Sequence, residues 1–296
     1  MMFPETGERK NMELKANGID ISKYQHPVDW DKLAAQYRAG TIGFVILRAG
    51  YGYSTTDERF EEYYAEATKR GIPLGAYWYA YWGAGTPTQE ANAFLSVVFG
   101  KTFTYGIWYD VEYEKSITGL DKTTRTNKVL EALGALAASG RYCGLYASTD
   151  MINNRLEYAR LSAYDVWVAQ YASKNTCKMA YGMWQFTSSG QVSGINTRVD
   201  LDHAYKDYPA MVKGTLATGN TKTPADNVPT DDPAPRDTVT LSIGPATGGD
   251  LRAILDKAKE LGLYQMGILD IGPMTDGDAK TILALADGLG LTVTEA

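Results

Sequence analysis

The segment YDVEYE at residues 109–114 places three acidic side chains at alternating positions. Residues i and i+2 of a strand point to the same face, so Asp110 and Glu112 are expected to be neighbours. Repulsion between adjacent carboxylates raises the pKa of one of them, which then keeps its proton near neutral pH. A protonated acid beside an ionised one can cleave a glycosidic bond. Glu114 is expected past the strand end, as a surface charge.

Three further acids stand at the ends of apolar, strand-like runs. Asp20 follows the apolar NGI segment, and Asp200 lies within RVDLD, with Asp202 two residues later. An acid inside an apolar pattern costs stability unless it has a partner or a function. A D-x-E triplet is also typical of solvated loops, and each acid alone could be structural. Together, the acids of three strands are expected to converge at one mouth.

The elements that would position these acids read as strands alternating with helices. Alternation predicts a mainly parallel sheet, and eight strands predict a closed β/α barrel with its site at the carboxyl ends. About 190 residues are few for a full barrel of roughly 250, so an irregular, TIM-like barrel without its late helices is expected. The expected strands are 17–21, 42–49, 73–81, 104–113, 142–148, 165–171, 182–187 and 197–201. The expected helices are 30–39, 57–70, 88–99 and 121–139.

The composition narrows the chemistry further. The 296 residues contain 21 Tyr and 6 Trp but only 2 His and 2 Cys, so zinc chemistry, a Cys–His nucleophile and a cofactor are not expected. The aromatic excess favours a cleft that stacks on sugars. A net charge of −6 argues against nucleic acid, and no apolar run approaches the roughly 20 residues of a membrane span. Residues 1–16 carry no apolar signal-peptide core.

The chain is expected to divide into a tail (1–16), a barrel (17–210), a linker (211–236) and a small module (237–296). The linker is rich in Thr, Pro, Asp and Gly. The module repeats the frame IGPxTxGDxxxIxxxAxxLGL with a period of 28 and carries nine acids against four bases. Its T-x-x-D spacing is typical of a helix capping box rather than a phosphate loop. A βαβαβ unit is therefore predicted.

Residues 18–208 resemble glycoside hydrolase family 25, the muramidases (lysozymes) common in phage endolysins. The resemblance implies an irregular β/α barrel that hydrolyses the β-1,4 bond between N-acetylmuramic acid and N-acetylglucosamine. The segments that carry it, in order, are GIDISKYQ (18–25), ILRAGYG (46–52), GIPLGAYWYAYW (71–82), YDVEYE (109–114), GLYAS (144–148), WVAQY (167–171) and WQFTSSGQVSGINTRVDLDHAY (184–205).

The family pattern also implies roles for the acids. Glu112 would donate the proton, Asp110 would lie beside it, and Asp20 and Asp200 would complete the acidic cluster. The family more often has Asn at the position of Asp202, which leaves the choice between the last two aspartates open. The expected substrate-binding residues are Tyr24, Arg48, Tyr51, Tyr77, Tyr79, Tyr146, Trp167, Gln185 and Asp202.

Several alternatives stay open. Hydrolysis with retention of the anomeric configuration could use a carboxylate nucleophile or the substrate's own N-acetyl group. Arg48 could pair with the acidic cluster or form a buried structural ion pair. A chitinase-type barrel is disfavoured because TYGIWY replaces its D-x-x-D-x-D run. A non-catalytic glycan-binding barrel is disfavoured because the acids are intact.

The resemblance also implies a partner and a setting. The expected partner is bacterial peptidoglycan of a Gram-positive wall, and the module would bind that wall or form a homodimer. The expected role is that of a phage endolysin, held in the host cytoplasm and released to the wall at lysis.

Overall fold

The computed structural model describes residues 12–212, 241–243 and 293–295. The chain divides into two compact units, residues 1–222 and 223–296. In the second unit, β10 (Leu241–Ile243) pairs antiparallel with β11 (Val293–Glu295). Most of the tail and linker, and the repeat of the expected βαβαβ module, lie outside the described residues.

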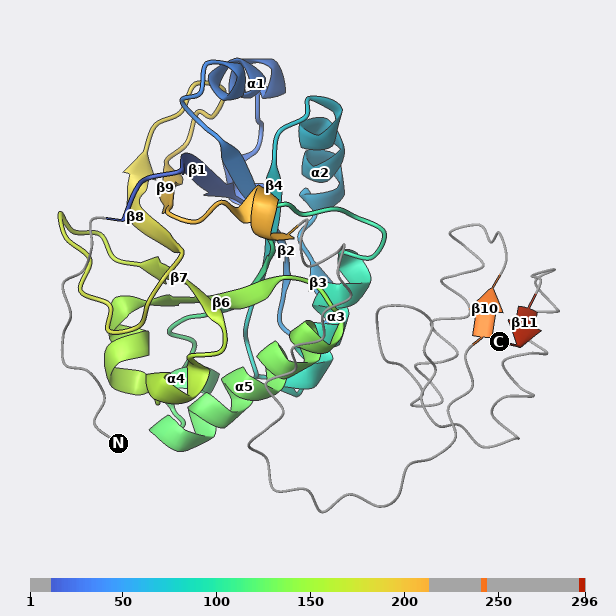
Figure 1. Ribbon diagram of the computed structural model, residues 1–296, viewed down its shortest axis with the longest axis vertical. Coiled ribbons are helices and arrows are strands. Elements are labelled where there is room, and N and C mark those ends of the chain that lie inside the picture. The colour runs from blue at the N-terminus through green and yellow to red at the C-terminus, as the bar shows by residue number, and fades with distance from the viewer. Residues whose placement is uncertain (1–11, 213–240, 244–292, 296) are drawn as a thin grey trace. The chain divides into compact units, whose positions relative to one another are not determined.

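The first unit is a closed eight-stranded barrel, as the sequence predicts (Figure 1). The barrel strands β1, β2, β4, β5, β6, β7 and β8 pair in parallel, whereas β9 is antiparallel to both β8 and β1 and closes the ring. The two-residue β3 (Thr55–Thr56) pairs antiparallel with the end of β2. The barrel strands are β1 (Ala16–Ile21), β2 (Phe44–Tyr51), β4 (Leu74–Tyr79), β5 (Ile107–Val111), β6 (Cys143–Ser148), β7 (Asp165–Ala169), β8 (Met183–Gly190) and β9 (Val199–Ala204).

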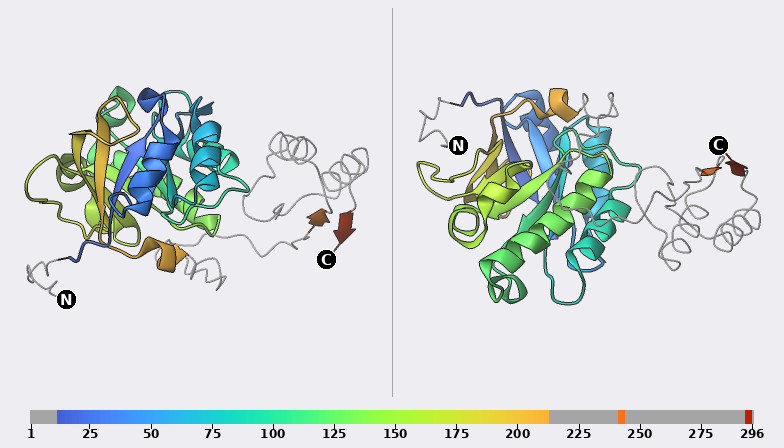
Figure 2. Two further views of the ribbon diagram at one scale, coloured as in Figure 1. Left: turned by 90° about the horizontal axis from the view of Figure 1, so that it is seen from above. Right: turned by 60° about the horizontal axis from the view of Figure 1, so that its bottom comes forward.

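Most helices follow the early strands, and Figure 2 shows them on the outside of the barrel. They are α1 (Trp30–Arg38), α2 (Phe60–Lys69), α3 (Pro87–Val97), the four-residue α4 (Lys115–Thr118) and α5 (Lys122–Ala138). A short helical segment at 208–212 follows the last barrel strand. Side-chain caps from Asp29, Thr86 and Asp121 fix the starts of α1, α3 and α5. Between β6 and β7 the chain forms only a π turn and a 3-10 turn, and no helix joins β7 to β8 or β8 to β9 in the described ranges. The expected loss of the late helices is confirmed.

Aromatic side chains fill one end of the barrel interior. Trp108 contacts both Trp167 and Tyr208 edge to face, and all three are almost fully buried. On the helical side, Trp78 stacks on Phe94 of α3 with ring centres 5.6 Å apart. The interior is therefore a packed core, and space for a ligand remains at the carboxyl ends of the strands. No helix within the described ranges is long and apolar enough to cross a membrane.

Candidate active site

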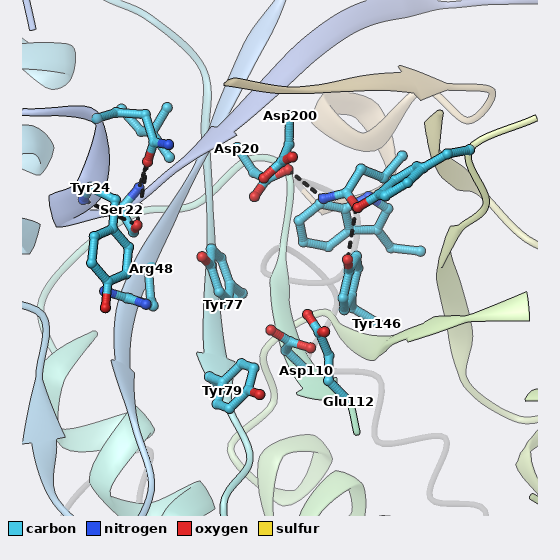
Figure 3. Close-up of a pocket in the computed structure, with 15 residues that line it drawn as sticks. Asp20, Ser22, Tyr24, Arg48, Tyr77, Tyr79, Asp110, Glu112, Tyr146 and Asp200 are labelled. Carbon is cyan, nitrogen blue, oxygen red and sulfur yellow. Dashed lines mark hydrogen bonds between the residues drawn. The ribbon is translucent and has the colours of Figure 1, made fainter. Parts of the chain in front are cut away.

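A pocket of about 230 Å³ opens at the carboxyl ends of the barrel strands (Figure 3). All of the residues predicted for the site line it except Tyr51 and Asp202. The lining residues are Asp20, Ile21, Ser22, Tyr24, Gln25, Arg48, Tyr77, Tyr79, Asp110, Glu112, Tyr146, Trp167, Tyr171, Gln185 and Asp200.

Two pairs of acids face each other across this pocket. Asp20 of β1 and Asp200 of β9 are direct partners in the antiparallel register. Asp110 is the penultimate residue of β5, and Glu112 follows it by two residues, on the opposite side of the ring. Figure 3 shows Tyr77 between the two pairs. The expected convergence of acids from three strands is what the structure shows.

Burial and mutual repulsion favour protonated carboxyl groups in this pocket. Burial raises the pKa of Glu112, and the charges of Asp200 and Glu114 raise it further. Burial also raises the pKa of Asp200 to about 6. The pKa of Asp110 lies well above its ordinary value because of burial and Glu112, although Arg48 opposes this shift. Neutral and ionised acids can therefore coexist near neutral pH, as acid-assisted bond cleavage requires.

One carboxyl oxygen of Asp110 is buried without a hydrogen-bond partner in the described part of the chain. The residue is 2% exposed, and its Oδ1 is buried without a hydrogen-bond partner among the described residues. A buried carboxylate oxygen without a donor is costly. A donor or a developing positive charge on a bound ligand would satisfy this oxygen.

Gln185 joins Asp20 and two tyrosines of the pocket lining in one hydrogen-bond network. Its Nε2 donates to Asp20 Oδ2 at 2.8 Å. Its Oε1 accepts from the hydroxyls of Tyr146 and Tyr171, each also at 2.8 Å. The two tyrosines therefore fix the amide so that its N–H faces Asp20.

Two expectations about individual residues are wrong. Tyr51 does not line the pocket, and its ring packs beside the Arg48 guanidinium, which lies 5.7 Å from the ring centre. Asp202 is fully buried behind the lining, since it lies farther along β9 than Asp200. Asp200 is therefore the late aspartate of the pocket. Glu114 lies past the end of β5, as expected, and accepts a hydrogen bond from Tyr79 at 2.7 Å.

Sequence reasoning missed some of the lining. Ser22 and Gln25 form a capping box around the 3-10 turn at Lys23–Gln25, which brings both side chains to the pocket edge. The S-x-x-Q spacing after Asp20 was the available signal. Tyr171 follows β7 by two residues, and only its membership of the aromatic WVAQY segment pointed to it.

The direct partner of Arg48 is Asp57, which lies outside the acidic cluster. Arg48 Nε donates to Asp57 Oδ2 at 2.7 Å, and the Asp57 side chain is 1% exposed. Asp57 also accepts from the backbone N–H groups of Lys23 and Arg59. Of the two alternatives for Arg48, the structure therefore shows the buried ion pair.

We expect Asp57→Ala to lower the free energy of unfolding by about 3–5 kcal/mol, because it leaves a buried guanidinium unpaired. The measurement is urea denaturation. Glu62→Ala is the matched control, since the Arg59–Glu62 pair has a Glu62 side chain 44% exposed. Its cost should be about 0–1 kcal/mol. Equal losses in the two variants would contradict the structural role of Asp57.

Comparisons with known proteins agree with this geometry. The model of "Glycosyl hydrolases family 25" matches residues 19–195. Lysozyme M1 of Streptomyces globisporus is 32% identical over 196 residues, which cover 62% of this chain and 65% of that protein. The bacterial lysozyme of Streptomyces coelicolor has the same fold, with a TM-score of 0.58, 22% identity, and coverage of 68% of this chain and 98% of that one. The catalytic domain of endolysin ply40, from bacteriophage P40 of Listeria monocytogenes, is 26% identical with a TM-score of 0.55, and the match covers 69% of this chain and all of that domain.

Proposed function

Because this chain belongs to glycosyl hydrolase family 25 and is a muramidase, a lysozyme that acts on peptidoglycan, we propose that Glu112 is its proton donor. Glu112 would protonate the oxygen of the β-1,4 bond between N-acetylmuramic acid and N-acetylglucosamine as that bond breaks. The observation that carries this role is the raised pKa of a pocket-lining Glu112 beside Asp110. A carboxyl group that keeps its proton near neutral pH is the general acid that the reaction needs.

The other acids would stabilise the positive charge that develops on the sugar ring. Asp110 presents an unpartnered oxygen on the same side as Glu112, and Asp20 and Asp200 face it from β1 and β9. Preorganised negative charge in a water-poor pocket stabilises an oxocarbenium-like transition state. Tyr77 lines the pocket and is partly exposed, so it supplies a flat surface against which a sugar ring can pack.

Analysis of the ends formed in digested peptidoglycan tests this function. The muramidase reaction predicts new reducing ends that are N-acetylmuramic acid. New N-acetylglucosamine ends would indicate another specificity, as expected of a chitinase-type barrel. A preparation that binds walls and forms no new ends would instead support a non-catalytic glycan-binding barrel.

The pH profile should respond to Asp200 in a definite direction. The charge of Asp200 raises the pKa of Glu112, so Asp200→Asn should lower that pKa. Glu112 must be protonated to act, and the alkaline limb of kcat/KM should therefore move to lower pH. The measurement is kcat/KM on a soluble glycan across pH. An alkaline limb at the same pH in Asp200→Asn would show that the charge of Asp200 does not affect the pKa of Glu112.

We also propose that the enzyme is a phage endolysin, made in a host cytoplasm and released to a Gram-positive wall at lysis. The likeness to the endolysin ply40 domain supports this role. The full chain, added from outside, should clear Gram-positive cells and spare cells whose outer membrane covers the peptidoglycan. Clearing of both types, or of neither, would argue against it.

The C-terminal segment 237–296 is proposed to bind the wall, which would raise the local concentration of the barrel there. The full chain should sediment with walls more strongly than a chain ending at residue 222, where the first compact unit ends. Equal sedimentation would argue against targeting. A homodimer of the full chain, lost on truncation, would favour assembly through this segment instead.

A further inference from the structure

Asp202 is a buried acid that the proposed chemistry does not use. Its exposed fraction is 0%, and its Oδ1 accepts a hydrogen bond from Trp167 Nε1 at 2.7 Å. Its Oδ2 is buried and has no donor among the described residues. An ionised carboxylate in that position would lack half of its stabilising contacts, at a substantial cost. A neighbouring carboxyl group that carries a proton would supply the missing donor.

The strand register shows which group is close enough to do so. In β9, Asp200 and Asp202 are two residues apart and point to the same side, into the barrel. Asp200 pairs with Asp20 of β1, while Asp202 pairs with Gly18. Asp20 is therefore the diagonal neighbour of Asp202, and the two buried carboxyl groups interact with each other, as Asp20 also does with its direct partner Asp200. Two carboxyl groups can hydrogen-bond only when a proton lies between them.

We propose that Asp20 and Asp202 share one proton, so that the two carboxyl groups together present a single negative charge to the pocket. Asp202 is then a positioning residue that acts through Asp20. The only side-chain donors to the pair in the described part of the chain are neutral, namely Gln185 to Asp20 and Trp167 to Asp202. No group of three His, Cys, Asp or Glu side chains in that part of the chain is arranged to hold a metal ion.

The charges around the pair favour retention of this proton. Asp200 faces both acids from β9, and Asp110 faces Asp20 from β5. Tyr77 of β4 lies close to both Asp20 and Arg48 of β2. Burial and the neighbouring carboxylates raise the pKa of both Asp20 and Asp202 well above the ordinary value. One shared proton removes the repulsion between the two groups.

The functional consequence rests on the proposed muramidase mechanism. With one shared proton, the Asp20–Asp202 pair carries one negative charge, which adds to that of Asp110 across the pocket in stabilising positive charge on the sugar. The shared proton also keeps Asp20 in place as an acceptor for Gln185. A doubly ionised pair would repel both its own members and Asp200. The proton itself can be detected without substrate, so failure of the mechanism and failure of the shared proton are distinguishable.

The test is a titration of the full chain labelled with ¹³C at the aspartate carboxyl carbons. In the unaltered chain, the Asp20 carbon should titrate in two steps, because the pair loses its protons one after the other. In Asp202→Asn, the amide can still accept from Trp167 and donate to Asp20. The pH midpoint of the last deprotonation seen at the Asp20 carbon should then fall by about one pH unit or more. An unchanged Asp20 titration would overturn the proposal.

A reciprocal variant gives a second measurement if Asp202→Asn does not fold. In Asp20→Asn, the last step of Asp202 should move down by the same amount, since the coupling between two sites is mutual. The raised pKa also has a stability signature, because a stabilising proton is lost as pH rises through the folded-state pKa. The thermal midpoint of Asp202→Asn, relative to the unaltered chain, should therefore rise as pH increases above the ordinary aspartate pKa. A constant difference would count against the shared proton.

Discussion

Glu112→Gln is expected to lower kcat on purified peptidoglycan by about 10²- to 10⁴-fold, the usual contribution of a general acid. The glutamine keeps the size and the position of the side chain, but it has no proton to give to the leaving oxygen. Release of reducing ends measures the loss. The variant should still sediment with walls, because binding surfaces outside the pocket are unaltered.

The same variant should not be less stable near neutral pH. The pKa of Glu112 is raised in the folded protein, so ionisation of this side chain costs stability as pH rises through that value. A neutral glutamine avoids this cost, and the thermal midpoint should stay level or rise. A large fall in the midpoint would mean that lost folding, rather than lost chemistry, explains the inactivity.

Glu114→Gln is the matched control for this experiment. Glu114 belongs to the same D-x-E-x-E run, but it accepts a hydrogen bond from Tyr79 and does not line the pocket. Its charge contributes to the raised pKa of Glu112, so a modest shift of the alkaline limb to lower pH is expected. Loss of activity as large as that of Glu112→Gln would contradict the assignment of the proton donor.

The barrel and most of the pocket could be predicted because they depend on local periodicity. Alternation along YDVEYE places Asp110 and Glu112 together, and the eight apolar runs correspond to the eight barrel strands. The short connections after residue 171 exclude full helices there, as the structure confirms. The family resemblance then points to the same acids, because its motifs lie at these strand ends.

What could not be predicted depends on pairing between distant segments. Alternation shows that Asp200 and Asp202 share a face, but only the register of β9 against β1 decides which one reaches the pocket. The partner of Arg48 is likewise nine residues away in a loop with no periodic pattern, so Asp57 went unnoticed. Ser22 and Gln25 belong to a three-residue turn, which is too short for any repeat.

Asp110→Asn should lower kcat by about 10²- to 10³-fold with little change in KM, because its charge matters most when positive charge develops on the sugar. The asparagine fills the same space, and the site is 2% exposed, so the shape of the pocket should be preserved. Steady-state kinetics on a soluble glycan separate the two parameters. A loss confined to KM would show that Asp110 serves ground-state binding instead.

The pH profile reports on the coupling between Asp110 and Glu112. The charge of Glu112 raises the pKa of Asp110, and the coupling between two charges is mutual, so an ionised Asp110 raises the pKa of Glu112 in turn. Asp110→Asn should therefore reduce the height of the kcat/KM profile and also move its alkaline limb to lower pH. Asp150→Asn is the control for an aspartate outside the pocket, because Asp150 pairs with Arg155 on a half-exposed surface. Its profile should match that of the unaltered chain, and a similar loss there would show that substitution of any nearby aspartate disturbs the barrel.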